Sequence, residues 1–396
     1  MKQLKVDLNT LSKEVSAQVV EWRRHFHRNP ELSFQEEKTS QFVYDTLRGF
    51  EKLEVSRPTK TSVMARLIGK EPGKVLALRA DMDALAILEE NEFEFKSQNP
   101  GVMHACGHDG HTAMLLGTAK ILSALQSEIK GEIRFLFQHA EEMYPGGAQE
   151  MVKAGVMDGV DEVIGAHLMS MMETGKIGIT YGPAMASSAE FSLKIQGKGG
   201  HAASPHETVD SIVVAAQVVT GLQHFVSRQI NPLDRLVLSV TRIHGGTANN
   251  IIPDSVELSG TVRCLDDQLH KEALRTMDQI IKGITSSYDA TYEFNYETGY
   301  KAVVNDGQLT RFVEEAATEI FGEDAIDHLP PQMGGEDFSA FHQKVPGSFI
   351  FIGAGNIAEG IDQPHHHPKF TIDERALPIG VRLMTETAFK KMRHDS

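Results

Sequence analysis

Residues 75–83, VLALRADMD, combine a short apolar strand with two carboxylates that follow it directly. Further β-rich runs with the same apolar character occur at residues 62–67, 133–137 and 163–166. Helical patterns separate these runs, and an alternation of strands and helices is typical of an α/β sheet. The sequence therefore predicts an α/β domain, with polar side chains placed where its strands end.

A different order of elements lies between residues 186 and 298. It contains, in order, a strand at 189–196, a helix at 208–228, strands at 236–243 and 255–263, a helix at 267–286 and a strand at 291–297. This β-α-β-β-α-β order is that of a ferredoxin-like sandwich. We therefore expect two domains: a mixed-sheet α/β domain formed by residues 1–185 and 299–396, and an inserted ferredoxin-like α+β domain formed by residues 186–298.

Composition narrows the possible partners and location. The 396 residues carry a formal net charge of −15, which opposes binding to nucleic acid or to an anionic membrane surface. No run of about 18 apolar residues occurs, so no membrane span is expected, and the first 15 residues lack the features of a signal peptide. Only Cys106 and Cys264 are present, which excludes a disulfide scaffold. These features predict a cytoplasmic protein that acts on small molecules.

The densest group of reactive side chains is His104-Ala-Cys106-Gly-His108-Asp109-Gly-His111, with five potential metal donors in eight residues. It ends where an amphipathic helix begins. One interpretation is metal or thiol chemistry, and the other is a polar capping loop with Asp109 as the N-cap. Cys106 and His108 suit a shared ion if the loop is extended, because residues two apart in an extended chain project to one side.

Two pairs of carboxylates follow predicted strands. Asp81 and Asp83 come after the strand at 75–79, and Glu141 and Glu142 come after the strand at 133–137. In such a pair one carboxylate could bind a metal while the other acts as a general base. Solvated loop acids are the alternative for either pair taken alone.

Histidines, which can also bind metals, occur after one further strand and in a loop near the end of the chain. His167 follows the strand at 163–166, and His365-His366-His367 lie in a late loop. A lone histidine at a strand end is more often a hydrogen-bonded edge residue, and three consecutive histidines cannot all point one way. Taken together, several strand ends and a late loop all offer donors that transition metals prefer. The joint pattern predicts a metal centre at the carboxyl ends of the strands.

With these motifs in order, the chain closely resembles the amidohydrolase branch of the M20 metallopeptidase family, which includes aminoacylases, hippurate hydrolases and hydrolases of auxin conjugates. The resemblance runs almost from end to end. Its motifs are RHFHRNPE (24–31), RADMDAL (79–85), MHACGHDGH (103–111), HAEE (139–142), GGHAASPH (199–206), NIIP (250–253), GGEDF (334–338) and HHPKF (366–370).

The resemblance implies two divalent ions per subunit, either Zn, Mn, Co or Ni, and it implies their ligands. These are Cys106, His108, Glu142, His167 and His366. Glu141 would be the general base, and Asp83 would orient a histidine ligand or lie just behind the metals. In the inserted domain His201 resembles the donor to the oxyanion, while Asn250 and Arg263 resemble groups that bind the substrate's carboxylate.

The resemblance also implies a reaction and an assembly. We expect metal-dependent hydrolysis of an N-acyl amino acid or a similar small amide, by a homodimer whose inserted domain is a lid that carries His201 into the partner's site. Alternatives within the family are a dipeptidase, a carboxypeptidase and an N-acetyl-diaminopimelate-like deacetylase. Outside it they are a cysteine hydrolase that uses Cys106, and a protein that binds metal or ligand without catalysis.

One departure from the family bears on the substrate. After Gly-Ala-His the chain reads Leu-Met-Ser-Met-Met at residues 168–172, where relatives often carry an aromatic residue and a proline. Methionines are therefore expected at a pocket edge that bears on the acyl group.

Overall fold

The computed structural model describes residues 7–393; residues 1–6, which begin the segment without signal-peptide features, and residues 394–396 lie outside this range. The described chain divides into two compact units. The first unit comprises the residues up to Gly182, Val304–Pro330 and the residues from Asp337 onward. The second unit comprises Pro183–Val303 and Pro331–Glu336. None of the helices within residues 7–393 combines the length and the apolar character that a bilayer span requires.

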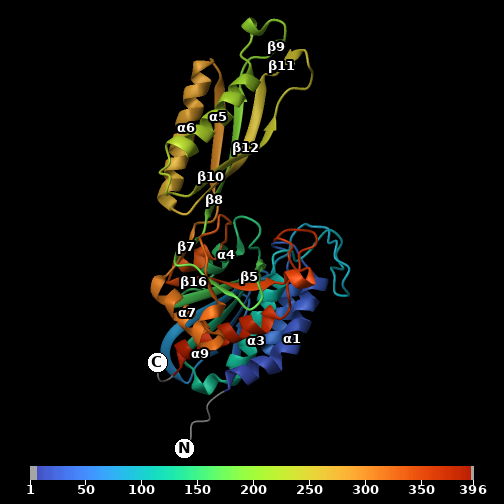
Figure 1. The fold of residues 1–396 in the computed structure, drawn as a ribbon, viewed down its shortest axis with the longest axis vertical. Coiled ribbons are helices and arrows are strands. Elements are labelled where there is room, and N and C mark those ends of the chain that lie inside the picture. Colours follow the sequence, from blue (N-terminus) through green and yellow to red (C-terminus); the bar gives the residue numbers. More distant parts are fainter. Residues whose placement is uncertain (1–6, 394–396) are drawn as a thin grey trace, which may run out of the picture. The chain divides into compact units, whose positions relative to one another are not determined.

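The first unit is built on an eight-stranded mixed sheet (Figure 1). In spatial order its strands are β1 (Leu53–Ser56), β2 (Val63–Ile68), β4 (Lys130–Gln138), β3 (Glu71–Asp81), β5 (Glu162–Glu173), β16 (Gly347–Gly355), β6 (Ile177–Ile179) and β15 (Ile326–His328). The central strands β4, β3, β5 and β16 are parallel, so their carboxyl ends meet at one edge of the sheet. Residues 349–352 of β16 are all apolar and buried, as expected for a strand that is covered on both faces. The mixed-sheet α/β class is confirmed.

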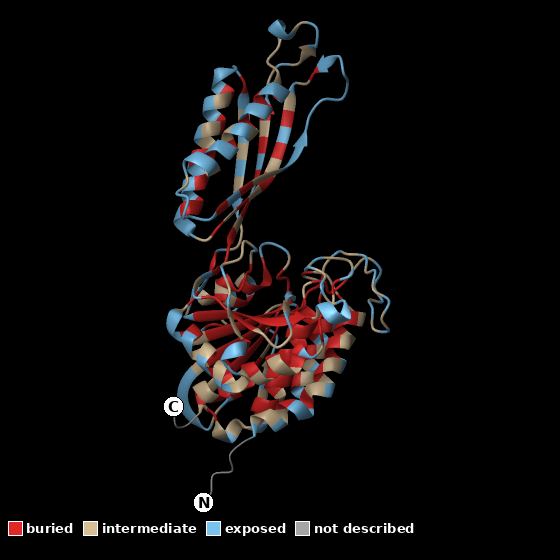
Figure 2. Ribbon diagram, viewed as in Figure 1, coloured by how far each residue is buried: buried red, intermediate tan, exposed pale blue. Residues whose placement is uncertain are grey.

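Helices of the first unit pack on this sheet. They are α1 (Leu8–Arg28), α2 (Glu37–Arg48), α3 (His108–Ala124), α4 (Gly147–Lys153), α7 (Gly307–Phe321), α8 (Ser339–His342) and α9 (Ala376–Met392). Helix α3 contacts α1, α9 and β3, and it is buried along almost its whole length (Figure 2). Because α3 begins at His108, the metal-donor residues around its first turn lie inside the protein.

The second unit has the ferredoxin-like order that the sequence predicts. Its sheet has the spatial order β10 (Leu236–His244), β12 (Ser255–Cys264), β8 (Ser187–Gln196) and β13 (Thr291–Thr298), with every neighbouring pair antiparallel. Helices α5 (Ser211–Arg228) and α6 (Asp267–Ser287) lie along one face (Figure 1). Burial alternates along β8, because the face toward the helices carries apolar residues such as Phe191 and Leu193.

Short pairings outside the main sheets complete the fold. Strands β9 (Gly200–His201) and β11 (Ile251–Ile252) pair with each other, as do β7 (Gly182–Met185) and β14 (Val303–Asn305) at the two connections between the units. The second unit therefore begins before residue 186 and ends after residue 298. The segment Pro331–Glu336 also belongs to it, although the expected boundaries assign this segment to the larger domain. The reason is that Gln332 and Gly334 form backbone hydrogen bonds with residues that lead into β8.

Candidate metal centre

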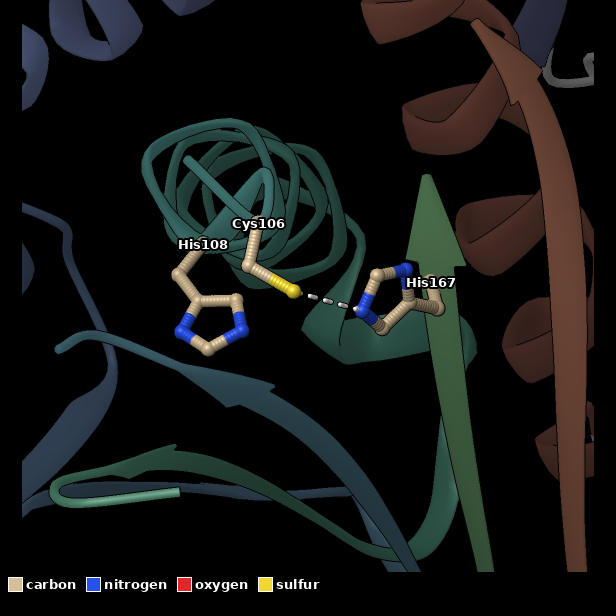
Figure 3. Close-up of side chains that lie close together, drawn as sticks. All are labelled: Cys106, His108 and His167. Carbon is tan, nitrogen blue, oxygen red and sulfur yellow. Dashed lines mark hydrogen bonds between the residues drawn. The ribbon is translucent and has the colours of Figure 1, made fainter. Parts of the chain in front are cut away.

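Cys106, His108 and His167 bring their donor atoms together at the carboxyl end of the central strands (Figure 3). His108 is the first residue of α3, Cys106 precedes it by two residues, and His167 lies within β5. Cys106 Sγ is 3.5 Å from His167 Nε2, and the donor atoms of all three residues lie within 4.8 Å of one another. The three buried side chains form a compact set of one sulfur and two nitrogen donors, which suits a transition metal.

The loop geometry at Cys106 and His108 differs from the expected one. The residue between them, Gly107, has a φ of 100° and is the N-cap of α3 in the left-handed conformation. Their convergence therefore comes from a left-handed glycine and not from an extended segment. The alternative in which Asp109 caps the helix is wrong as well, because its carboxylate accepts from Arg23 Nε and contacts His27 Nδ1, each at 2.8 Å.

Glu142 and His366 extend the same cluster. His366 Nε2 is 3.2 Å from Glu142 Oε1, and these two residues form a second potential ligand group with Cys106. His366 is held in a left-handed conformation with a φ of 65°, and its backbone N–H donates to the carbonyl oxygen of Ala105 at 2.8 Å. The late loop is thus bound directly to the loop that carries Cys106. All five predicted ligands belong to one contiguous cluster.

Glu141 lies in this cluster too. It is 6% exposed, and it forms a third potential ligand group with His108 and Glu142. It follows Ala140, whose φ of 48° turns the chain sharply after β4. Glu141 is not one of the five predicted ligands, but its buried carboxylate lies beside them. It is therefore suitably placed for proton transfer.

Asp83 orients His108. Both its carboxylate Oδ1 and its backbone oxygen lie close to His108 Nδ1, at 3.2 Å and 3.0 Å. Asp83 Oδ2 accepts from Ser33 Oγ at 2.7 Å and from the backbone N–H of Glu142 at 3.0 Å. One carboxylate therefore links two of the predicted ligands, and it assigns the His108 ring proton to Nδ1. His108 Nε2 is buried without a hydrogen-bond partner, and in the neutral ring this nitrogen would carry the lone pair that a metal needs.

Asp81 has a different set of contacts from Asp83. Its carboxylate contacts His111 Nδ1 at 2.6 Å and accepts from Arg79 Nη1 at 2.7 Å. His111 Nε2 in turn accepts from the backbone N–H of Leu168 at 2.8 Å, so Nδ1 carries the ring proton. The pair Asp81 and His111 therefore fixes the backbone of β5 next to His167.

The charges of the cluster fit a bound cation. Burial lowers the pKa of His108, but Asp81, Asp83 and Glu142 outweigh burial and raise it to about 10. Burial, together with Glu142 and Glu141, raises the pKa of the Cys106 thiol well above its usual value. Burial and the neighbouring His111 keep the pKa of His167 well below its usual value, so that ring is neutral. A divalent cation would balance the carboxylates and favour the Cys106 thiolate.

Glu36, which no sequence motif predicts as a site residue, is buried and supports the Glu141–Glu142 turn. Its Oε1 accepts from the backbone N–H of Ala140 at 2.7 Å, and its Oε2 accepts from Thr61 Oγ1 at 3.0 Å. Burial and the nearby Asp83 raise the pKa of Glu36 from 4.5 to about 7. Nothing in the local pattern distinguishes Glu36 from its exposed neighbour Glu37, so only the tertiary structure identifies it.

We expect Glu36→Gln to flatten the pH dependence of thermal stability in the metal-free protein. Since the folded-state pKa of about 7 lies above the usual 4.5, the folded state binds this proton more tightly. The contribution of Glu36 to stability is then fully present below about pH 4.5 and declines as the pH rises toward 7. Melting temperatures between pH 4.5 and 8 measure the effect, with Glu37→Gln as the exposed control. Identical slopes for wild type and Glu36→Gln would contradict it.

The three remaining predicted site residues lie in the second unit. His201 is exposed on β9, and its Nδ1 accepts from the backbone N–H of Ala203 at 3.1 Å, so in the neutral ring Nε2 carries the proton. Asn250 is its neighbour, because the Asn250 carbonyl oxygen accepts from the N–H of Ala202. Arg263 is near the end of β12, whose first residue, Ser255, follows β11 closely.

These three residues do not form one group within a chain. Arg263 is eight residues beyond Ser255 along β12, which corresponds to about 27 Å of strand at about 3.4 Å per residue. Figure 1 shows β9 and β11 beyond one end of the four-stranded sheet. His201 and Asn250 are therefore at one end of the second unit and Arg263 is near the other. Asn250 and Arg263 of the same chain cannot contact one carboxylate.

Comparison with known proteins identifies the family. The model of peptidase family M20/M25/M40 matches residues 77–390. An N-acyl-L-amino acid amidohydrolase of Geobacillus stearothermophilus is 64% identical over 301 residues, which cover 76% of this chain and 81% of the relative. Thermostable carboxypeptidase 2 of Saccharolobus solfataricus is 43% identical over 372 residues, covering 93% of this chain and 94% of the relative.

A solved structure agrees with these relatives. The crystal structure of the Bacillus subtilis YXEP protein, a dinuclear metal-binding peptidase from the M20 family, has a TM-score of 0.84 and 36% identity, and the match covers 96% of this chain and 99% of that one. The chain therefore belongs to peptidase family M20/M25/M40. It is a metal-dependent amidohydrolase, and the resemblance stated from the sequence is confirmed.

Proposed function

We propose that this chain hydrolyses the amide bond of N-acyl amino acids, using two divalent ions held by side chains of the first unit. The ligands would be Cys106, His108, Glu142, His167 and His366. The observation that carries the proposal is their convergence from separate segments into overlapping groups, with Cys106 common to two of them. When bound, such ions polarise a carbonyl group and lower the pKa of water toward about 7. Thiolate, imidazole and carboxylate together suit Zn, Mn, Co or Ni.

Glu141 is the general base in this proposal. It is buried next to Glu142 and His108, and its carboxylate can accept a proton from the attacking water and deliver that proton to the leaving amine. Asp83 acts through His108 and Glu142, which it orients. Because Glu36 supports the turn that presents Glu141, it positions the base indirectly.

His201 is proposed to donate a hydrogen bond to the oxyanion. Its Nδ1 is already used as an acceptor, so the neutral ring presents Nε2–H as a donor. One well-placed donor of this kind is worth about 3 kcal/mol in the transition state. Asn250 lies beside His201 and would act with it, while Arg263 would bind the substrate's carboxylate through its fork of donors.

The separation of Arg263 from His201 and Asn250 supports a homodimer with shared active sites. If residues at both ends of the second unit take part in catalysis, they belong to different active sites. A twofold dimer formed through the inserted unit would then supply the residues of one end to each active site. Each site then takes its metals and Glu141 from one chain, and His201 from the partner. The inserted unit would thus be both lid and dimerisation domain.

We expect two inactive variants to restore activity when mixed. His201→Ala subunits lack the donor and Glu141→Ala subunits lack the base, but one of the two sites in a mixed dimer has both. Random exchange makes half of the dimers mixed, so about a quarter of wild-type activity is the ceiling. The assay follows amide cleavage after subunit exchange has been verified. A mixture that exchanges but stays inactive would place His201 in its own chain's site, or in neither.

A substrate panel tests the proposed function against its family alternatives. We expect an N-acyl amino acid to be cleaved faster than its C-terminal amide, because the amide leaves Arg263 without its carboxylate, at a cost of about 2–5 kcal/mol. Dipeptides and N-acetyl-diaminopimelate in the same panel test the dipeptidase, carboxypeptidase and deacetylase alternatives. Preferred cleavage of unblocked dipeptides, or of peptides from the carboxyl end, would overturn the N-acyl assignment.

The remaining alternatives have less support. A cysteine hydrolase needs a thiolate, but burial and the nearby glutamates raise the pKa of Cys106. A non-catalytic binding protein would lack a ligand or the base, and none of the predicted residues is replaced. Cys106 and Cys264 are both free thiols, which agrees with the proposed cytoplasmic location.

A further inference from the structure

The GGEDF motif at residues 334–338 contains a buried carboxylate, Asp337, for which the proposed mechanism gives no role. Asp337 belongs to the first unit and is 1% exposed. Its two oxygens accept from Arg79 Nη2 at 3.0 Å, from Gln138 Nε2 at 2.7 and 2.8 Å, and from the backbone N–H of Ala148 at 3.0 Å. A buried carboxylate with this many donors holds its partners in one geometry.

Asp337 holds both ends of the segment that carries the proposed base. Gln138 is the last residue of β4 and Ala148 lies in the first turn of α4, so residues 139–147 lie between the two contacts. The N-cap residue of α4 makes no side-chain capping bond, and Asp337 supplies an acceptor to this helix end from a remote segment. The loop that contains the base is therefore fixed where it leaves the strand and where it enters the helix.

Two carboxylates described above hold the middle of the same loop. Glu36 and Asp83 each accept from a backbone N–H group inside it. Asp337 differs from them because it also lies close to the base itself: one of its oxygens is within 4.8 Å of a Glu141 carboxylate oxygen. Three buried carboxylates on different segments thus restrict the loop between β4 and α4.

Arg79 connects Asp337 to another part of the metal cluster. Its Nε donates to Gln138 Oε1 and its Nη1 donates to Asp81 Oδ2, each at 2.7 Å. Asp81 in turn contacts His111, which accepts from a backbone N–H of β5. Arg79 is 1% exposed, so its charge balances Asp81 and Asp337 inside the protein. One arginine therefore joins the base loop to β5.

We propose that Asp337 is the positioning residue for the general base, Glu141. By holding Gln138 and Ala148 it fixes the loop between them, and so it determines the distance from Glu141 to the attacking water. The inference rests on the proposed function, because it takes Glu141 as the base. A displacement of about 1 Å in a reacting group can cost about 10²-fold in rate.

The proposed ligands depend much less on Asp337. Only Glu142 among them lies in this loop, and Asp83 holds the backbone N–H of Glu142 directly. Loss of Asp337 should therefore disturb the base more than the metal centre.

The test is Asp337→Asn in the metal-loaded full-length enzyme, which places an amide N–H where the carboxylate accepts. With the best N-acyl amino acid of the substrate panel, we expect kcat to fall about 10- to 100-fold. KM should stay within about threefold, because substrate binding is not changed. Elemental analysis should find the wild-type amount of metal. Hydrogen exchange of the backbone amides at residues 139–148 should become roughly tenfold faster, as the loop loses a fixed end.

Gln138→Glu combined with Asp337→Asn is the rescue variant. It exchanges the acid and the amide between the two positions, so Arg79 keeps the same negative charge beside it. We expect this double variant to recover part of the lost kcat. If Asp337 acted only by capping α4, the exchange would restore nothing.

Asp306→Asn is the matched control. Asp306 caps α7 in the same unit, where its carboxylate accepts from the backbone N–H groups of Gln308 and Leu309 at 3.0 and 2.8 Å. The same chemical change at this helix end should leave kcat and the exchange of residues 139–148 at their wild-type values.

Unchanged kcat in Asp337→Asn, or loss of metal in proportion to kcat, would overturn the proposal. If this variant does not fold, Gln138→Leu decides, because it leaves Asp337 bonded to Arg79 and Ala148. Gln138→Leu should also lower kcat and speed exchange in the loop, and wild-type values of both would overturn the proposal. Failure of the wild-type enzyme to cleave any N-acyl amino acid would instead refute the proposed function.

Discussion

Glu141→Gln should lower kcat by about 10²- to 10⁴-fold while the bound metal stays near the wild-type amount. The amide of glutamine has nearly the shape of the carboxylate but cannot take a proton from water. Because the five proposed ligands are untouched, the donor set that surrounds Cys106 is preserved. The loss corresponds to about 3–5 kcal/mol of transition-state stabilisation, at about 1.36 kcal/mol per tenfold. Steady-state kinetics alongside elemental analysis measures both quantities.

Glu142→Gln is the matched control for this prediction. Glu142 contacts His366 and lies near His108, so its replacement should remove metal and activity together. The two adjacent glutamates would then give opposite results for metal content. If Glu141→Gln loses metal in proportion to its activity, the roles of the two glutamates are reversed or wrong.

Removal of divalent ions should abolish amide hydrolysis, and adding back Mn, Co or Zn should restore it. Without the cations, water is too weak a nucleophile at neutral pH and the carbonyl stays unpolarised. Activity measured after exhaustive chelation, and again after each metal is added, decides the matter and also ranks the metals. Undiminished turnover in the chelated protein would end the metal mechanism and favour attack by Cys106.

The two cysteines provide the control for the metal site. Cys106→Ser should lose metal and activity, since serine replaces a soft thiolate ligand with a poor one. Cys264→Ser should keep both, because Cys264 is buried in the second unit, where its sulfur lies 3.3 Å from Ser187 Oγ. Equal losses in both variants would mean that substitution damages the fold and not the metal centre.

Much of the fold could be predicted from the sequence, because its signals are local. The apolar strand at 75–79 reappears within β3, and the β-α-β-β-α-β order of the inserted domain is present in full. Strands of three or four residues, such as β6 and β15, were missed because so few residues show no periodicity. The boundary at Pro331–Glu336 was missed because backbone hydrogen bonds to a distant segment determine it.

The candidate ligands could be named from the sequence because each one ends or follows a recognisable element and matches a family motif. Their convergence is a tertiary fact: the left-handed Gly107 turns Cys106 toward His167, and the His366 backbone is bound to Ala105. The support from Glu36 is of the same kind, since its partners Ala140 and Thr61 are remote in sequence.

By itself, then, the sequence determined the α/β class, the inserted domain and the residue types of the metal centre, because periodicity and motifs depend only on residues that are close together in the sequence. Only the tertiary structure decided which atoms meet: that Asp83 links His108 to Glu142, and that Asn250 and Arg263 of one chain stand too far apart to share a carboxylate. The physical reason is that distances between remote segments depend on how strands, helices and turns pack, and no local pattern records them.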